Sequence, residues 1–115
     1  MLNFQADFVS SSAVKLVLIM KPSLALEAHR ADIRRIVAAN RAANARVFGS
    51  ALHHADTETS DLDILIDPLP QLTLFRIAQM QIELERTLGV KVDIRTPGDL
   101  PDKILTTVLR ECRPI

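Results

Sequence analysis

The segment Gly49–Asp67, "GSALHHADTETSDLDILID", contains the most informative pattern in the chain. It has a Gly-Ser pair, an interval over residues 51–60, and then Asp61 and Asp63 as Asp-x-Asp. Acidic and apolar residues alternate in "SDLDILID", which is typical of a strand with one face in a core. Three interpretations compete: a loop and half-buried strand without chemistry, a metal-binding structural turn, and a metal-dependent site for phosphate.

Patterns outside this segment predict helices and two further strands. The predicted elements are a helix over residues 22–43, a strand over 45–48, the strand of "SDLDILID", a helix over 71–88, a strand over 90–95 and a helix from about residue 101. Ser23 is the expected N-cap of the first helix and Asn44 its stop, and Gly89 is the expected C-cap of the second. The order α-β-β-α-β-α predicts an α/β (α+β) fold with a small mixed β-sheet and helices packed on one face.

Length and composition exclude several classes of protein. The chain has 115 residues, enough for one domain, and its formal net charge is zero. A neutral chain has no general attraction to DNA or to an anionic membrane, so we expect neither partner. Four Phe with no Tyr or Trp argue against a base-stacking platform. The single Cys112 excludes an internal disulfide and fits a cytoplasmic location.

The first residues of the chain form a separate segment in this interpretation. The apolar run Ala13–Met20 is too short to span a membrane, and it lacks the flanking features of a signal peptide. Residues from Met20 onward have the composition of an ordinary folded chain. We therefore expect residues 1–19 to be an N-terminal extension, either loosely ordered or docked as an extra strand. Residues 20–115 are expected to form one domain.

Three acids are expected to project from one polar face. Asp61 and Asp63 alternate with apolar residues on one predicted strand, and Asp93 does so in "VKVDIR" on another. If these strands are near each other in one sheet, the three carboxylates repel one another unless a cation neutralises them. Hard divalent cations such as Mg²⁺ favour oxygen ligands and leave positions open for water and phosphate. The pattern therefore favours a site for one or two such ions.

Gly49 and Ser50 are placed to bind an anion next to these acids. A glycine after a strand lets another group approach the backbone closely. Ser50 can cap a short helical turn over "ALHHA", whose N–H groups favour phosphate. An anion-binding turn beside a metal-binding pair of acids is what phosphoryl or nucleotidyl transfer requires.

At these residues the sequence resembles the minimal nucleotidyltransferases of the DNA polymerase β superfamily. The signature of that family is Gly-Ser, ten residues, Asp-x-Asp, and a third acid on a later strand. Gly49-Ser50, Asp61-Leu62-Asp63 and Asp93 match it in order and spacing, and the likeness covers about residues 23–112.

The resemblance implies a Mg²⁺-dependent transfer of a nucleoside monophosphate, most often AMP from ATP, with Mn²⁺ as a substitute metal. Asp61 and Asp63 would hold the metal; Asp93 would complete its ligand shell and help to deprotonate the acceptor hydroxyl. The residues expected to bind nucleotide and phosphate are Gly49, Ser50 and Ser60. Family members of this size are often antitoxins paired with a helical HEPN toxin, which some adenylylate. The resemblance thus implies a HEPN-type partner, in a homodimer or hetero-oligomer.

The sequence departs from the family after the Gly-Ser pair. The family usually has a basic residue and then a second glycine, and here His53 and His54 stand at those places. Two adjacent histidines seldom bind one ion, so a zinc site is not expected. Asp67 before Pro68 is interpreted as a residue of the turn that ends the strand, and Cys112 as a core residue.

Two other functions stay open. The protein could be a binding antitoxin that masks its partner with little or no catalysis. It could also transfer a nucleotide to a small molecule such as an antibiotic, although so short a chain offers few walls for a small acceptor. Dependence on Asp61 and Asp63 separates the first alternative from the enzyme, and turnover without a partner protein identifies the second.

Overall fold

The computed structural model describes residues 20–115, so the prediction for residues 1–19 lies outside the described part. The elements are helices α2 (Pro22–Ala28) and α3 (Arg30–Ala39), strand β1 (Ala42–Phe48), helix α4 (Gly49–Leu52), strand β2 (Leu62–Pro68), helix α5 (Leu74–Leu88), strand β3 (Val92–Arg95), the 3-10 helix η1 (Pro97–Asp99), helix α6 (Asp102–Glu111) and strand β4 (Arg113–Pro114).

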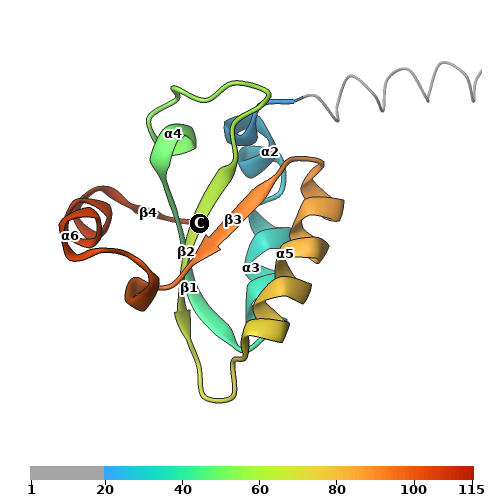
Figure 1. Ribbon diagram of the computed structural model, residues 1–115. Coiled ribbons are helices and arrows are strands. Elements are labelled where there is room, and N and C mark those ends of the chain that lie inside the picture. The colour runs from blue at the N-terminus through green and yellow to red at the C-terminus, as the bar shows by residue number, and fades with distance from the viewer. Residues whose placement is uncertain (1–19) are drawn as a thin grey trace, which may run out of the picture.

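The four strands form one mixed sheet in the order β3-β2-β1-β4 (Figure 1). β1 is antiparallel to both of its neighbours, β2 and β4, whereas β2 and β3 are parallel. The predicted α+β class with a small mixed sheet is confirmed. The short strand β4 was not predicted, because two residues carry too little pattern to be recognised in a sequence.

The main core lies between the sheet and helices α2, α3 and α5, which cover one of its faces (Figure 1). Leu62, Ile64 and Ile66 of β2 are fully buried in it, as the alternation predicts. The helices contribute, among others, Ile33, Ile36, Met80 and Leu84. Burying a large apolar side chain contributes roughly 1.5–3 kcal/mol, so this core strongly determines which way β2 faces. The residues that alternate with it, Asp63 included, must face the other side.

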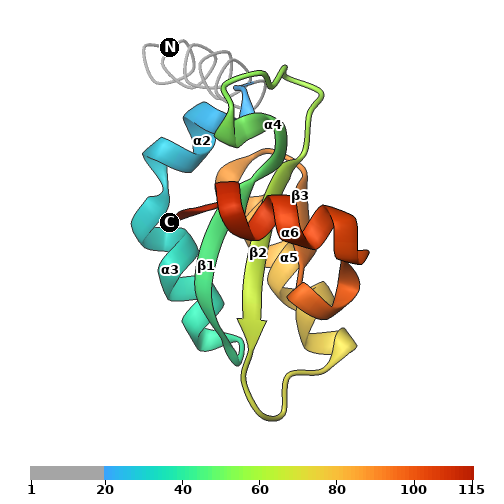
Figure 2. The ribbon, with the colours of Figure 1, turned by 90° about the vertical axis from the view of Figure 1, so that its left-hand side faces the viewer.

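Helix α6 differs from the prediction of helices on one face, because it crosses the opposite face of the sheet, over β1 and β2 (Figure 2). Leu65 shares that face with Asp63 and is nevertheless fully buried. Among the apolar residues of α6, Val108 is buried, whereas Ile104 and Leu109 are 50% and 48% exposed. Cys112 is only partly buried, so its predicted place in the core was wrong. The acidic face is therefore partly covered.

The predicted first helix, residues 22–43, is two helices that meet at His29. Ser23 lies inside α2 and does not cap it. Strand β1 begins at Ala42, and Asn44 is part of that strand instead of a helix stop. Asn44 has a left-handed backbone, with φ of 55°, where the pairing of β1 with β2 shifts register. An irregularity of this kind bends a strand locally, and the single-residue Asn signal does not distinguish it from a helix end.

Helix α5 begins and ends at recognisable signals. The Thr73 side chain accepts a hydrogen bond from Arg76 N at 3.1 Å, which caps its start. Gly89 follows its last residue with a left-handed φ of 74°, as predicted for a C-cap. Within residues 20–115, no helix combines the length and the apolar content that a membrane crossing needs.

Candidate active site

Strand pairing brings two of the predicted catalytic acids next to each other. β2 and β3 are parallel neighbours, and their register sets Asp63 directly opposite Asp93. Adjacent strands lie about 4.8 Å apart, and side chains at paired positions point to the same face. Asp61 is exposed immediately before β2, two residues ahead of Asp63. The three acids therefore share one end of the polar face of the sheet.

Gly49 lies against the second of these acids. It begins α4 directly after β1, and its backbone is left-handed, with φ of 74°. A Cβ at this position would overlap Asp63 Oδ2 and lie 3.1 Å from Asp63 Cγ. Only glycine therefore allows the turn to close over the Asp63 carboxylate without displacing it. The Gly-Ser turn and the Asp-x-Asp pair, separated in sequence, are one packed unit in the structure.

The two predicted phosphate-binding serines differ in their surroundings. Ser50 is the second residue of α4 and is partly buried, next to Gly49. Ser60 closes a turn: its Oγ accepts a hydrogen bond from Thr57 N at 2.9 Å and lies 3.3 Å from Thr57 Oγ1. The Ser60 hydroxyl therefore shapes the approach of the chain to Asp61. Its predicted role in binding nucleotide stays a prediction.

Asp63 has an unusual protonation equilibrium. Its pKa is raised from 3.8 to about 6, chiefly because burial disfavours the ionised carboxylate. The negative charges of Asp93 and then Asp61 raise it further, and Arg95 partly offsets them. A half-buried carboxylate whose charge is this poorly compensated is a strong candidate for a functional group.

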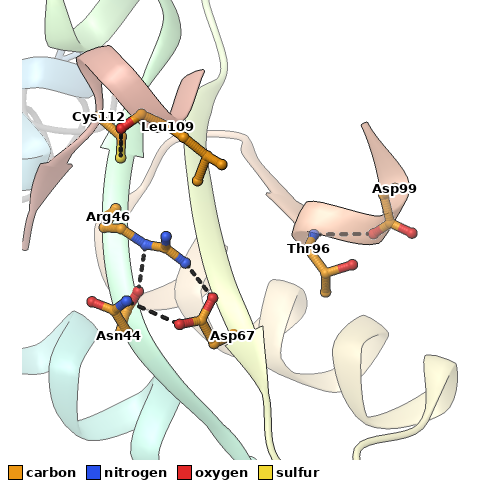
Figure 3. A network of polar contacts seen from close by, with 7 residues as sticks. All are labelled: Asn44, Arg46, Asp67, Thr96, Asp99, Leu109 and Cys112. Atoms are coloured by element: carbon orange, nitrogen blue, oxygen red, sulfur yellow. Dashed lines mark hydrogen bonds and ion pairs between the residues drawn. The ribbon is translucent and has the colours of Figure 1, made fainter. Parts of the chain in front are cut away.

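Asp67, on the same face of β2, has the opposite environment (Figure 3). Its carboxylate accepts hydrogen bonds from Asn44 Nδ2 at 2.9 Å and from Arg46 Nη2 at 2.5 Å. The hydrogen bond from Asn44 is the main reason why the pKa of Asp67 lies below its usual range, and Arg46 adds to it. The same figure shows Asp99 accepting from Thr96 N in the turn after β3. Asp67 thus belongs to a structural network, whereas Asp63 is left available for a ligand.

The carboxylate of Asp93 is already paired with a basic side chain. Arg95 Nε donates to both carboxylate oxygens of Asp93, at 3.2 Å to Oδ1 and 3.1 Å to Oδ2. Among residues 20–115, no three His, Cys, Asp or Glu side chains converge closely enough to hold a metal ion as they stand. The alternation in "VKVDIR" puts Asp93 and Arg95 on one face of the strand but does not predict their contact. Their spacing of two along a strand was the available signal.

The two histidines belong to a different part of the surface. His53 Nε2 lies 3.1 Å from Glu111 Oε2 at the end of α6. Together with Arg30 and Arg110, both histidines line a pocket bounded by α2, α4 and the end of α6. His54 has a left-handed φ of 54°, so it keeps a backbone conformation that suits glycine, the residue usual in the family at this place.

Asp56, which no sequence pattern singled out, fixes the loop between α4 and β2. Asp56 is 5% exposed, and its Oδ2 accepts a hydrogen bond from Ser23 N at 2.7 Å. Burial is the largest influence on the pKa of Asp56 and raises it, but the hydrogen bonds from Ser23 and from the Asp56 backbone, together with the charge of Lys21, bring the pKa below its usual value. A lone Asp in a polar loop carries no sequence signal for a contact this distant. The contact ties the loop that carries Ser60 to the start of α2.

The residues present fit a hard divalent cation. Asp61, Asp63 and Asp93 offer only oxygen donors, which Mg²⁺ and Mn²⁺ prefer over the nitrogen and sulfur that zinc favours. The raised pKa of Asp63 reflects uncompensated negative charge that such a cation would neutralise. Two of these acids face each other across paired strands. The third acid, Asp93, is also paired with Arg95.

The chain is similar to known proteins over most of its length. A family model described as polymerase beta, nucleotidyltransferase matches residues 31–115. Protein adenylyltransferase MntA of Thermococcus cleftensis is 34% identical over 86 residues, which are 75% of this chain and 84% of that protein. A Methanocaldococcus jannaschii protein, provisionally named protein adenylyltransferase MJ1217, is 32% identical over 65 residues. Those residues are 56% of this chain and 66% of that relative, just under two thirds of its length.

Solved structures agree with the sequence comparison. A structure described as a minimal nucleotidyltransferase superposes with a TM-score of 0.74 at 35% identity, covering 81% of this chain and 95% of that one. A toxin–antitoxin crystal structure with AMP-PNP superposes with a TM-score of 0.60 at 17% identity, covering 70% of this chain and 66% of that one. At this lower identity the likeness concerns the fold alone. By the family match over residues 31–115 and the identity to MntA, the chain belongs to the polymerase beta-type nucleotidyltransferase family.

Proposed function

We propose that this protein is a Mg²⁺-dependent protein adenylyltransferase, which moves AMP from ATP to a hydroxyl group of a partner protein. The observation that carries the proposal is the setting of Asp63. Its half-buried carboxylate has a pKa of about 6, pairs in register with Asp93, and lies under the Gly49 turn. Metal-binding acids packed against an anion-binding turn suit transfer between a triphosphate and a hydroxyl. The likeness to MntA, a protein adenylyltransferase, supports a protein as acceptor.

Each residue has a defined task in this proposal. Asp61, Asp63 and Asp93 hold one or two divalent ions, which supply charge neutralisation for the phosphates and the leaving group. The Gly49 turn and Ser50 hold the β- and γ-phosphates through backbone N–H groups and the hydroxyl. The acceptor oxygen forms a bond to the α-phosphorus while the bond from that phosphorus to the bridging oxygen breaks. Pyrophosphate leaves with the electron pair, and Asp93 helps to take the hydroxyl proton.

The partner in this proposal is a helical HEPN-type toxin, with this protein as its antitoxin. Support comes from the resemblance to MntA and from the shared fold with a protein of a toxin–antitoxin complex. We place the pair in the cytoplasm, in keeping with the single unpaired Cys112. Homodimers or hetero-oligomers are compatible with this role.

The test is intact-mass spectrometry of a helical HEPN-type partner protein after its co-expression with this protein. Wild type should add one or more adenylyl groups, and the Asp61→Asn/Asp63→Asn double variant should add none. Glu83→Gln, which removes an exposed carboxylate from α5, is the matched control and should modify the partner like the wild type.

The other outcomes identify the alternatives. A partner that co-purifies unmodified with both wild type and the double variant would show an antitoxin that works by masking. Metal-dependent consumption of ATP with a small-molecule hydroxyl and no partner would show a small-molecule transferase. Either result contradicts the proposal.

A further inference from the structure

Arg95 contacts the Asp93 carboxylate, which the proposed metal site needs as a ligand. The two residues lie two positions apart on β3, so their side chains share a face of the strand. Arg95 Nε is 3.2 Å and 3.1 Å from the two oxygens of Asp93, so both oxygens serve the guanidinium. Asp63, directly opposite Asp93 in the register, receives no comparable contact within the described residues. The paired acids are therefore unequally neutralised.

Within residues 20–115, no three carboxylate, imidazole or thiol side chains are arranged to hold a metal ion as they stand. Two carboxylates at paired positions of parallel strands repel each other unless a positive charge lies nearby. Asp93 already has such a charge beside it, the Arg95 guanidinium of the same strand. Arg95 also weakens the repulsion at Asp63, which shows that its charge acts on the same cluster.

We propose that Arg95 is a positioning residue that competes with divalent cations for Asp93. Metal alone binds weakly, and the full set of ligands forms when the nucleotide triphosphate draws the guanidinium away. The inference rests on the proposed function, because it concerns the same metal and nucleotide. Arg95 thereby couples metal binding to nucleotide binding at this site.

The exchange requires little free energy. The Arg95 and Asp93 side chains are 45% and 34% exposed, and ion pairs this exposed are weak. A guanidinium hydrogen-bonds phosphate oxygens as well as it does a carboxylate. Once a triphosphate lies on the Gly49 turn, the Arg95 guanidinium can pair with a phosphate oxygen in place of the Asp93 carboxylate. Its positive charge then still has a negatively charged partner. Asp93 is then released to the metal.

Lys91, the exposed residue immediately before β3, provides a matched control. It lies two residues before Asp93, as Arg95 lies two residues after it, and both are exposed. Arg95 contributes to the pKa of Asp63 and contacts Asp93, whereas Lys91 is not among the charges that shift Asp63. Lys91→Gln and Arg95→Gln remove the same charge, so a difference between them reports the contact itself.

The experiment measures Mn²⁺ binding directly, by the electron paramagnetic resonance signal of the free ion. Wild type, Arg95→Gln, Lys91→Gln and Asp63→Asn are titrated without nucleotide and again with a non-hydrolysable ATP analogue. Without nucleotide, Arg95→Gln should bind Mn²⁺ about two- to five-fold more tightly than wild type, the factor expected of an exposed ion pair. Lys91→Gln should match wild type. With the analogue, the advantage of Arg95→Gln should disappear, because Arg95 then contacts phosphate.

The failures are distinguishable. If wild type binds no Mn²⁺, or if Asp63→Asn binds it equally well, the proposed metal site is wrong and this inference falls with it. If wild type binds through Asp63 but Arg95→Gln gains nothing over Lys91→Gln, the proposed function stands and the role of Arg95 is refuted. If Arg95→Gln still binds Mn²⁺ more tightly than wild type by the same factor when the analogue is present, the coupling to nucleotide is refuted. Circular dichroism of each variant confirms that it is folded.

Discussion

Replacing Asp63 by Asn should make the metal-free protein more stable, although it removes a residue proposed to be catalytic. Asn keeps the shape of the side chain and carries no charge, so it avoids both the desolvation of a carboxylate and the repulsion from Asp93 and Asp61. The expected gain is a test of the electrostatic interpretation of the site. A purely surface aspartate would give almost no change.

The magnitude follows from the pKa of Asp63, which is 3.8 in its ordinary state and about 6 in the fold. At about 1.4 kcal/mol for each tenfold change in proton affinity, the difference sets an upper limit of about 3 kcal/mol. Because the carboxylate is only half-buried, solvent screens part of this energy, and we expect a gain of about 1–2 kcal/mol at neutral pH.

The sign of the pH dependence is fixed by the same values. The folded protein binds the Asp63 proton more tightly than the unfolded chain, so ionisation of this group weakens the fold. The penalty is complete above a pH of about 6 and is relieved as the pH falls towards 3.8. The advantage of Asp63→Asn should therefore be full at about pH 7.5 and largely gone at about pH 4.

Urea denaturation in the presence of a chelator measures these differences. Asp67→Asn on the same strand is the control, and it should be destabilised, because Asn44 and Arg46 hold the Asp67 carboxylate in its charged form. Added Mg²⁺ should stabilise wild type and leave Asp63→Asn unchanged. A less stable Asp63→Asn variant at neutral pH, or a gain that does not vary with pH, would contradict the electrostatic interpretation of Asp63.

Three further substitutions test the surroundings of the site. Gly49→Ala should lower the free energy of unfolding in urea by at least roughly 1–2 kcal/mol and abolish most transfer, because its Cβ displaces Asp63; Gly98→Ala, whose Cβ would meet nothing nearer than 4.0 Å, should change neither. His54→Gly should raise the midpoint of urea denaturation by the equivalent of about 0.5–1 kcal/mol, since it relieves a left-handed backbone; a loss would show that side-chain contacts dominate there. Asp56→Ala should cost about 1–3 kcal/mol in the same assay, because it orphans a backbone N–H at the start of α2, and an unchanged midpoint would contradict the anchoring role.

Much of the fold could be predicted because its strongest signals are local. The alternation in β2, the left-handed Gly89 and the apolar face of the first helical region each follow from a few consecutive residues. The side of the sheet chosen by α6 could not be predicted in this way. Helix α6 crosses the acidic face of the sheet (Figure 2), and Leu65, which shares that face with Asp63, is fully buried. An apolar residue among acids was a weak signal for that cover.

The candidate site, too, could be predicted only in part. Asp61, Asp63, Asp93 and Gly49 follow from spacing, and the register of β2 with β3 explains why that spacing has a spatial meaning. The hydrogen bonds and ion pairs around these residues depend on side-chain geometry, which the spacing of residues in the sequence does not determine. Whether Arg95 turns towards Asp93 or towards solvent is a choice of rotamer, and no pattern of residue types determines it.

The pairing of Asp63 with Asp93 is protected against a slip in strand register by the buried residues on either side of Asp93. The apolar residues Val92 and Ile94 alternate with Asp93 on β3 and are buried in the core beside β2. A slip of β3 by one residue would expose these two side chains and bury charged ones, at a cost far beyond that of losing a ligand. The packing of the core therefore sets the register of the acids, so a correctly folded chain has Asp63 and Asp93 aligned. Substitutions in the loops can alter the specificity of such a site while its acids stay aligned.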